Sequence, residues 1–74
     1  MDKIVVSFHT SADAFAFEKA CNQTSVAGRL TTIPRVISAG CGLAWTAPLA
    51  ERARIEALIG ERALLYEGLH EMLR

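Results

Sequence analysis

A β-branched run that passes almost directly into a helix start is the feature that most constrains the fold of this chain. Residues 4–8, Ile-Val-Val-Ser-Phe, combine β-branched and aromatic side chains, which is typical of a strand. Thr10 and Asp13 follow with the S/T-x-x-D/E spacing, in which a hydroxyl and a carboxylate satisfy free amides of a first helical turn. The sequence therefore predicts a strand over 4–8 and a helix that runs from Thr10 to about Gln23.

Two further strands are expected on either side of a loop. Residues 29–33, Arg-Leu-Thr-Thr-Ile, alternate like a strand and stop at Pro34, which has no amide donor for a ladder. Residues 43–47, Leu-Ala-Trp-Thr-Ala, are expected to return antiparallel to them. Residues 34–42 therefore form a loop between two strands.

The C-terminal part is expected to hold a helix, a strand and a short tail. A helix is expected over 48–59, because proline suits the first helical position and Gly60 suits a C-terminal cap. The Leu-Leu-Tyr core of residues 63–67 favours a fourth strand. Gly68 permits a turn, and residues 69–74 fit one or two amphipathic helical turns.

The predicted order is strand, helix, strand, strand, helix, strand, the split βαβ or ferredoxin-like arrangement of an α+β domain. It implies an antiparallel four-stranded sheet with two helices on one face, in a single small domain over residues 1–74. The first and second strands then end at the same edge, which brings His9 and Thr10 beside the 34–42 loop. An open α+β sandwich of three strands with a helical C-terminus is the alternative.

Composition and charge exclude several classes of protein. Hydrophobic residues make up 51% of the chain and eight basic residues balance eight acidic ones, which argues against a nucleic-acid surface and against disorder. No apolar run is long enough to cross a membrane, and the first residues do not resemble a signal peptide. We therefore expect a cytoplasmic protein with reduced thiols and no nucleic-acid or membrane partner.

The small size of the chain favours self-association. A chain of 74 residues is near the lower limit at which one hydrophobic core suffices. A sheet covered on one face is expected to leave Val5, Trp45 or similar residues open to solvent or to a second copy. The sequence therefore favours a homodimer.

The loop over 34–42 carries a thiol between two glycines. The flanking Gly40 and Gly42 argue against a packed apolar role, so Cys41 is interpreted as a reactive residue. A thiol reacts as its thiolate, and a free cysteine with a pKa of about 8.5 is only slightly ionised at neutral pH. The fold must therefore stabilise the anion.

Several groups near the loop are candidates for that stabilisation. They are the Arg35 guanidinium, the positive end of the first helix, and backbone amides around Gly40 and Gly42 that can form an anion-binding nest. His9 is a candidate hydrogen-bond donor or base. Ser38 either fixes the loop by a bond to its own backbone or contacts a bound sulfur anion. His9 and Arg35 also fit ordinary solvated loop residues.

Cys21 is interpreted as a core residue. It recurs with Ala14 and Phe17 at helical spacing on the side of the first helix that is expected to be buried. The chain has no CxxC pair, and a zinc site would need both cysteines and both histidines to converge. We therefore expect no metal and no cofactor, while a resolving reaction of Cys21 with Cys41 stays an alternative.

The loop and its surroundings resemble a known family. The chain matches the P-R-x-x-S-x-x-C-G loop of the Se/S carrier protein-like family, a small bacterial family, at Pro34, Arg35, Ser38, Cys41 and Gly42. The resemblance spans roughly residues 4–67 and departs from the family at Cys21 and in the tail over 68–74. It implies an α+β fold and a loop cysteine that carries sulfur or selenium.

Three functions fit these observations. In the first, Cys41 is the acceptor and donor of a persulfide-type group, and the protein is a carrier between a donor and an acceptor protein rather than a stand-alone enzyme. The second is a binding or regulatory module that dimerises through its sheet and uses Arg35 to clamp an anion or partner. The third is a thiol redox sensor. A stand-alone hydrolase is disfavoured because no carboxylate pair or Ser-His-Asp set is discernible.

Overall fold

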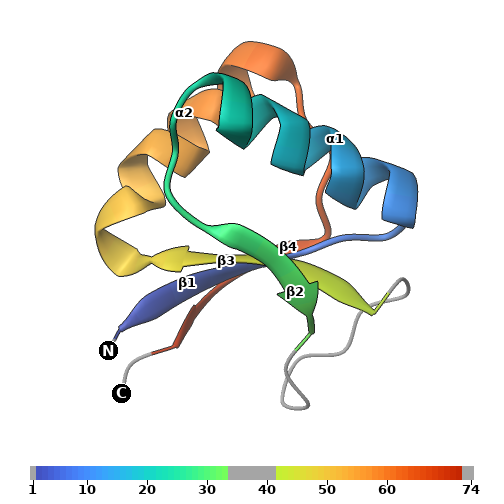
Figure 1. Ribbon diagram of the computed structural model, residues 1–74, viewed down its shortest axis with the longest axis horizontal. Coiled ribbons are helices and arrows are strands. Elements are labelled where there is room, and N and C mark those ends of the chain that lie inside the picture. Colours follow the sequence, from blue (N-terminus) through green and yellow to red (C-terminus); the bar gives the residue numbers. More distant parts are fainter. Residues whose placement is uncertain (1, 34–41, 73–74) are drawn as a thin grey trace.

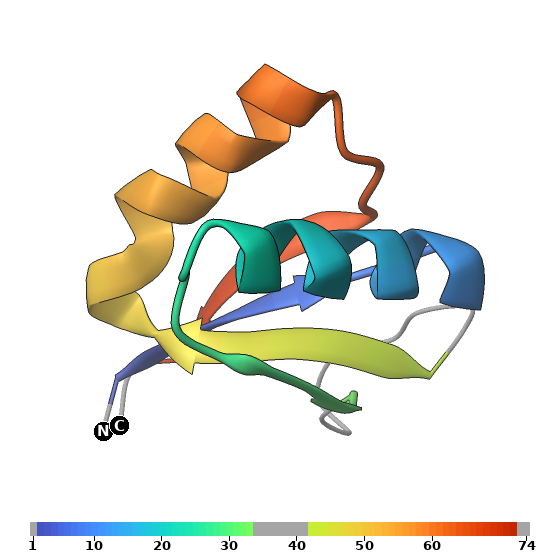
Figure 2. The same ribbon diagram turned by 45° about the horizontal axis from the view of Figure 1, so that its top comes forward.

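The structure, a computed structural model, describes residues 2–33 and 42–72. Its elements in chain order are β1 (Lys3–Ser7), α1 (Ser11–Gln23), β2 (Arg29–Thr32), β3 (Leu43–Pro48), the 3-10 turn η1 (Leu49–Glu51), α2 (Arg52–Arg62) and β4 (Gly68–Met72). The strands form one antiparallel sheet in the order β2-β3-β1-β4, and both helices lie on one face of it (Figures 1 and 2). The ferredoxin-like α+β prediction is confirmed, and the three-stranded alternative is wrong.

The first helix begins where its capping residue predicts. Thr10 has an extended backbone, with φ of −135° and ψ of 157°, and its Oγ1 accepts a hydrogen bond from the Asp13 N–H at 3.1 Å. This bond satisfies one of the free amides of the first turn. The helix then buries one side against the sheet, through Ala14, Phe17, Ala20 and Cys21.

The second helix differs from its prediction at both ends. Pro48 is the last residue of β3 rather than the first of a helix, and η1 separates it from α2. Gly60 lies inside α2 instead of capping it. The helix ends where Ala63 takes a left-handed conformation, with φ of 50°, and Leu64 N–H donates to the Ile59 carbonyl at 3.2 Å.

The fourth strand, β4, spans Gly68–Met72. The predicted strand over 63–67 and the predicted turn at Gly68 are therefore wrong. The helical turns predicted from residue 69 are also wrong up to Met72, where the described residues end. Pairing with β1 decides the outcome, because Ser7 lies opposite Gly68. Leu69 in β4 then packs against the core beneath the helices, whereas Leu65 remains 67% exposed. A strand forms where a partner strand is available, and in the Leu-Leu-Tyr segment Leu64 packs against the core while Leu65 and Tyr66 are exposed.

The helix-covered face of the sheet carries the aromatic core. Phe8 packs edge-on against Phe17 with ring centroids 5.2 Å apart, and the Trp45 ring lies 6.1 Å from Phe17. Trp45 is only 1% exposed, because its position in β3 directs it toward the helices. The expectation that Trp45 stays open to solvent or to a second copy is therefore wrong.

The opposite, helix-free face is also closed near its centre. Val5 and Ala44 are fully buried there and pack with Ile33 and Met72. The expectation that Val5 is open is therefore wrong as well. The large apolar side chains that are exposed in the described chain are instead Phe15, Leu65 and Tyr66.

Candidate functional site

Most of the predicted site falls in the segment between β2 and β3. Arg35, Ser38, Gly40 and Cys41 lie outside the described residues. Its two ends are described: the Ile33 N–H donates to the Gly42 carbonyl at 3.0 Å. Both ends of the segment are therefore held together at one end of the sheet, which we call the loop end.

The β1–α1 connection lies at the same loop end. Thr32 pairs with Leu43 at the start of β3, and the next β3 residue, Ala44, pairs with Ser7 at the end of β1. His9, which follows β1 after one residue, is exposed. The N-terminus of α1 begins two residues beyond it, so the positive end of the helix dipole also lies at the loop end.

Gly42 has the geometry of a residue at an open turn. Its φ is +73°, a left-handed conformation that favours glycine. A Cβ built on it would meet no heavy atom of the described residues within 4 Å, its chain neighbours aside. The backbone conformation therefore favours glycine at this position, and none of the described residues outside its chain neighbours crowds it.

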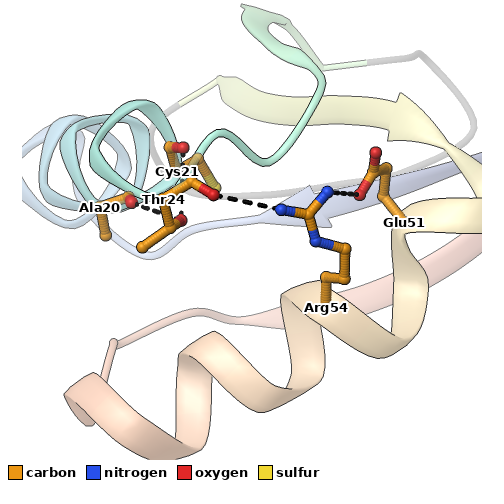
Figure 3. A network of polar contacts seen from close by, with 5 residues as sticks. All are labelled: Ala20, Cys21, Thr24, Glu51 and Arg54. Atoms are coloured by element: carbon orange, nitrogen blue, oxygen red, sulfur yellow. Dashed lines mark hydrogen bonds and ion pairs between the residues drawn. The ribbon is translucent and has the colours of Figure 1, made fainter.

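Cys21 lies in the core, as the sequence predicts. It is fully buried on α1, and burial together with the negative charge of Glu51 raises the pKa of its thiol from 9.0 to about 11. Figure 3 shows the polar contacts around it: Arg54 donates to the Thr24 carbonyl at 3.1 Å and to Glu51 at 3.2 Å. These contacts tie the end of α1 to α2 beside the thiol.

Cys21 also lies far from the loop end. Helix α1 begins at Ser11 beside the loop end and runs back along the sheet toward the opposite end (Figure 2). Cys21 is ten residues further along the helix, which at a rise of about 1.5 Å per residue corresponds to about 15 Å. Burial and position together therefore oppose a disulfide between Cys21 and a thiol at the loop end.

The helix-free face carries a polar pair that the sequence did not reveal. Ser7 is fully buried, and its Oγ lies 3.2 Å from the Nε2 of His70 and 3.4 Å from the Gly68 carbonyl oxygen. A Cβ on Gly68 would approach His70 Nε2 to 3.0 Å, so the glycine leaves room for the imidazole. The one sign of this pair in the sequence is Ser7 itself, a polar residue within the otherwise apolar run of residues 4–8.

Comparison with known proteins gives the family. The sequence profile of the family described as "Putative Se/S carrier protein-like" matches residues 3–71. The chain belongs to this family. The match extends through Glu71, so most of β4 is part of the shared sequence rather than a departure from it. No curated protein and no solved structure matches the Se/S carrier-like chain significantly.

Two features are absent from the part of the chain that the structure describes. No helix formed by residues 2–33 and 42–72 is long and apolar enough to span a membrane. Over the same residues, no three His, Cys, Asp or Glu side chains are grouped so that they can hold a metal ion.

Proposed function

We propose that the chain is a sulfur or selenium carrier in which Cys41 holds the transferred atom. The observation that carries this proposal is the family match over residues 3–71. The role of Cys41 itself is argued from its sequence motif, because the residue lies outside the described part of the chain. The partners are a donor and an acceptor protein in the cytoplasm, where thiols stay reduced.

The proposed transfer step conserves atoms and electrons. The Cys41 thiolate attacks the outer sulfur of a persulfide on the donor protein, so that an S–S bond forms on Cys41 while the donor's S–S bond breaks. The donor leaves as a thiolate and takes up a proton. An acceptor thiolate then attacks the outer sulfur on Cys41, and Cys41 returns to its starting form. A selenium atom in the outer position follows the same path.

The described surroundings of the loop end support this chemistry. The N-terminus of α1 and the exposed His9 lie at the same end of the sheet, and a helix N-terminus favours a nearby anion. Arg35, Ser38 and the amides of Gly40 and Gly42 are the proposed supports of the thiolate from within the segment.

Cys21 is unsuited to the carrier role. A thiol that is fully buried and has a pKa of about 11 is almost entirely protonated at neutral pH and out of reach of a partner. The same burial argues against a redox sensor that works through a disulfide within the chain. Cys41 is then the one thiol proposed to exchange sulfur.

Mass spectrometry of the intact protein tests the proposal. The protein is incubated with a cysteine desulfurase and cysteine, and the mass of one added sulfur atom is expected on the wild type and on the matched control Cys21→Ser. Cys41→Ser is expected to gain none. Sulfur that persists on Cys41→Ser, or that is absent from the wild type, would contradict the carrier function.

The homodimer stays a prediction, and the exposed sheet residues on which it was based are not found. Val5 and Trp45, which were expected to form the contact, are buried within one copy of the chain. Native mass spectrometry at micromolar concentration tests the prediction directly. A single monomeric species would also remove the sheet-mediated dimer of the regulatory-module alternative.

A further inference from the structure

A surface cavity lies at the end of the sheet opposite the loop end. It is formed where β1 and β2 begin and β3 ends, and its volume is about 370 Å³. It is lined by Asp2, Lys3, Gly28, Arg29, Thr46, Ala47 and Pro48. Ligand pockets in proteins begin at about 300 Å³, so this volume is in the range that accepts a small molecule.

The charges around the cavity favour an anion. Lys3 and Arg29 contribute two positive charges and Asp2 one negative charge, so the lining carries a net charge of +1. Within the described part of the chain, neither Lys3 nor Arg29 forms an ion pair. The aliphatic stems of both side chains, together with Ala47 and Pro48, provide apolar surface next to these cationic groups.

Behind the Gly28 wall of the cavity lies the buried indole N–H of Trp45. The Nε1 of Trp45 is buried, and no hydrogen-bond partner for it exists among the described residues. Gly28 lies directly over this atom, since a Cβ on Gly28 would stand 2.6 Å from Nε1 and 2.7 Å from the Thr46 carbonyl oxygen. Only glycine fits this position, and Gly28, which lines the cavity, stands between the cavity and the indole edge of Trp45.

The size of the cavity distinguishes between classes of anion. At about 30 Å³ for each water-sized group, 370 Å³ holds about a dozen non-hydrogen atoms. An inorganic oxyanion of sulfur, selenium or phosphorus has only a handful and makes no use of the apolar surface. We propose that this cavity binds a small organic anion, with its charged group between Lys3 and Arg29 and its apolar body against Gly28, Ala47 and Pro48.

This site is separate from the proposed carrier chemistry. Gly42 lies immediately before β3 and the cavity lies at the end of that strand, where Thr46 and Pro48 line it. Several residues of extended strand at about 3.3 Å each separate the two. A ligand in the cavity is therefore neither the transferred atom nor bonded to it, and the inference does not depend on the carrier function.

The single tryptophan of the chain gives a direct reporter for the test. We suggest heteronuclear NMR of isotope-labelled protein, in which the Trp45 indole N–H is followed during titration. The probes are naphthoate, its neutral isostere naphthamide, and inorganic phosphate. A saturable shift of the indole resonance with naphthoate, at least several-fold tighter than with either other probe, is the expected result.

Two variants locate the charged group of the ligand. Lys3→Gln with Arg29→Gln is expected to weaken naphthoate binding roughly fivefold, as expected for loss of exposed charge pairs. Lys19→Gln, which removes an exposed cation of α1 outside the cavity, is the control and should bind normally. Naphthamide that binds as tightly as naphthoate, phosphate that does so, an unmoved indole resonance, or undiminished binding by the double variant would each overturn the proposal.

Discussion

The two faces of the sheet are built from different kinds of side chains. The helix-covered face holds the large rings of Phe8, Phe17 and Trp45, packed edge-on or tilted at 5.2 and 6.1 Å. The helix-free face has a smaller buried centre made of Val5 and Ala44, with the half-buried Ile33 and Met72 and the Ser7–His70 pair around it. Both faces are buried near their centres, but with very different amounts of apolar surface.

This difference indicates that the two faces contribute unequally to the stability of the fold. Burial of aromatic rings contributes more to folding than burial of small side chains, because the hydrophobic contribution grows with apolar area. The helix-free face buries fewer large side chains, and one member of its cluster, Ile33, is the residue directly before the predicted loop. We therefore expect substitutions on the helix-covered face to change stability most, and the predictions below follow that order.

The largest effect is expected for Phe17→Ala. Removal of a fully buried ring from the centre of the aromatic core should lower the free energy of unfolding by about 3–5 kcal/mol. Phe15→Ala is the matched control on the same helix, and because Phe15 is 55% exposed its effect should stay within about 0.5 kcal/mol. Urea unfolding followed by circular dichroism measures both, and equal losses would contradict the assignment of the core.

The second effect concerns the buried thiol and alkaline pH. Because the pKa of Cys21 rises from 9.0 to about 11 on folding, its contribution to stability is fully present below pH 9 and is lost as the pH rises from 9 to 11. A difference of that size in pKa corresponds to at most about 2.7 kcal/mol. The difference in unfolding free energy between wild type and Cys21→Ala should shrink over that interval, and a constant difference would refute the raised pKa.

The third prediction compares the effects on stability of two glycine-to-alanine substitutions. Gly28→Ala should lower stability by about 2 kcal/mol, because the new Cβ would stand 2.6 Å from the Trp45 Nε1 and the φ of +142° is unfavourable for alanine. Gly60→Ala meets no atom within 4 Å and lies inside α2, so it should raise stability by about 0.5–1 kcal/mol. Thermal unfolding of both variants checks the opposite signs.

The last prediction concerns the helix-free face. A double-mutant cycle of Ser7→Ala and His70→Gln should give a coupling of about 1 kcal/mol, the usual net contribution of one hydrogen bond. Denaturant unfolding of the four proteins measures it. A coupling as large as the loss in Phe17→Ala would break the contrast between the faces, and additive effects would show that the two side chains act independently.

Local signals explain which parts of the fold were predictable. The start of α1 follows from the Thr10 cap and its hydrogen bond to Asp13, which involve only neighbouring residues. Gly60 misled the prediction because a glycine at an exposed helical position is locally indistinguishable from a cap, while Ala63 takes that role instead. The position of β4 depends on pairing with β1, and residues 61 apart in sequence carry no local sign of it.

The candidate sites also include features that were predictable from local sequence and features that were not. The loop motif around Cys41 was visible in the sequence because its residues are contiguous, and the burial of Cys21 followed from helical spacing. The Ser7–His70 pair and the cavity beside Lys3 and Arg29 each join distant segments. The residues of the pair and of the cavity show no periodicity or motif in the sequence, because only strand pairing in the folded protein brings these distant segments together.

The position of β4 has a consequence for synthesis of the protein. Strand β1 is made first, yet one of its two neighbours in the sheet is supplied by residues 68–72. Until those residues pair with it, β1 is an edge strand with unpaired N–H and C=O groups, and such edges pair readily with other chains. Pairing with β4 moves the apolar run Ile4-Val5-Val6 from the edge of the sheet to its interior, and the edge position passes to β4.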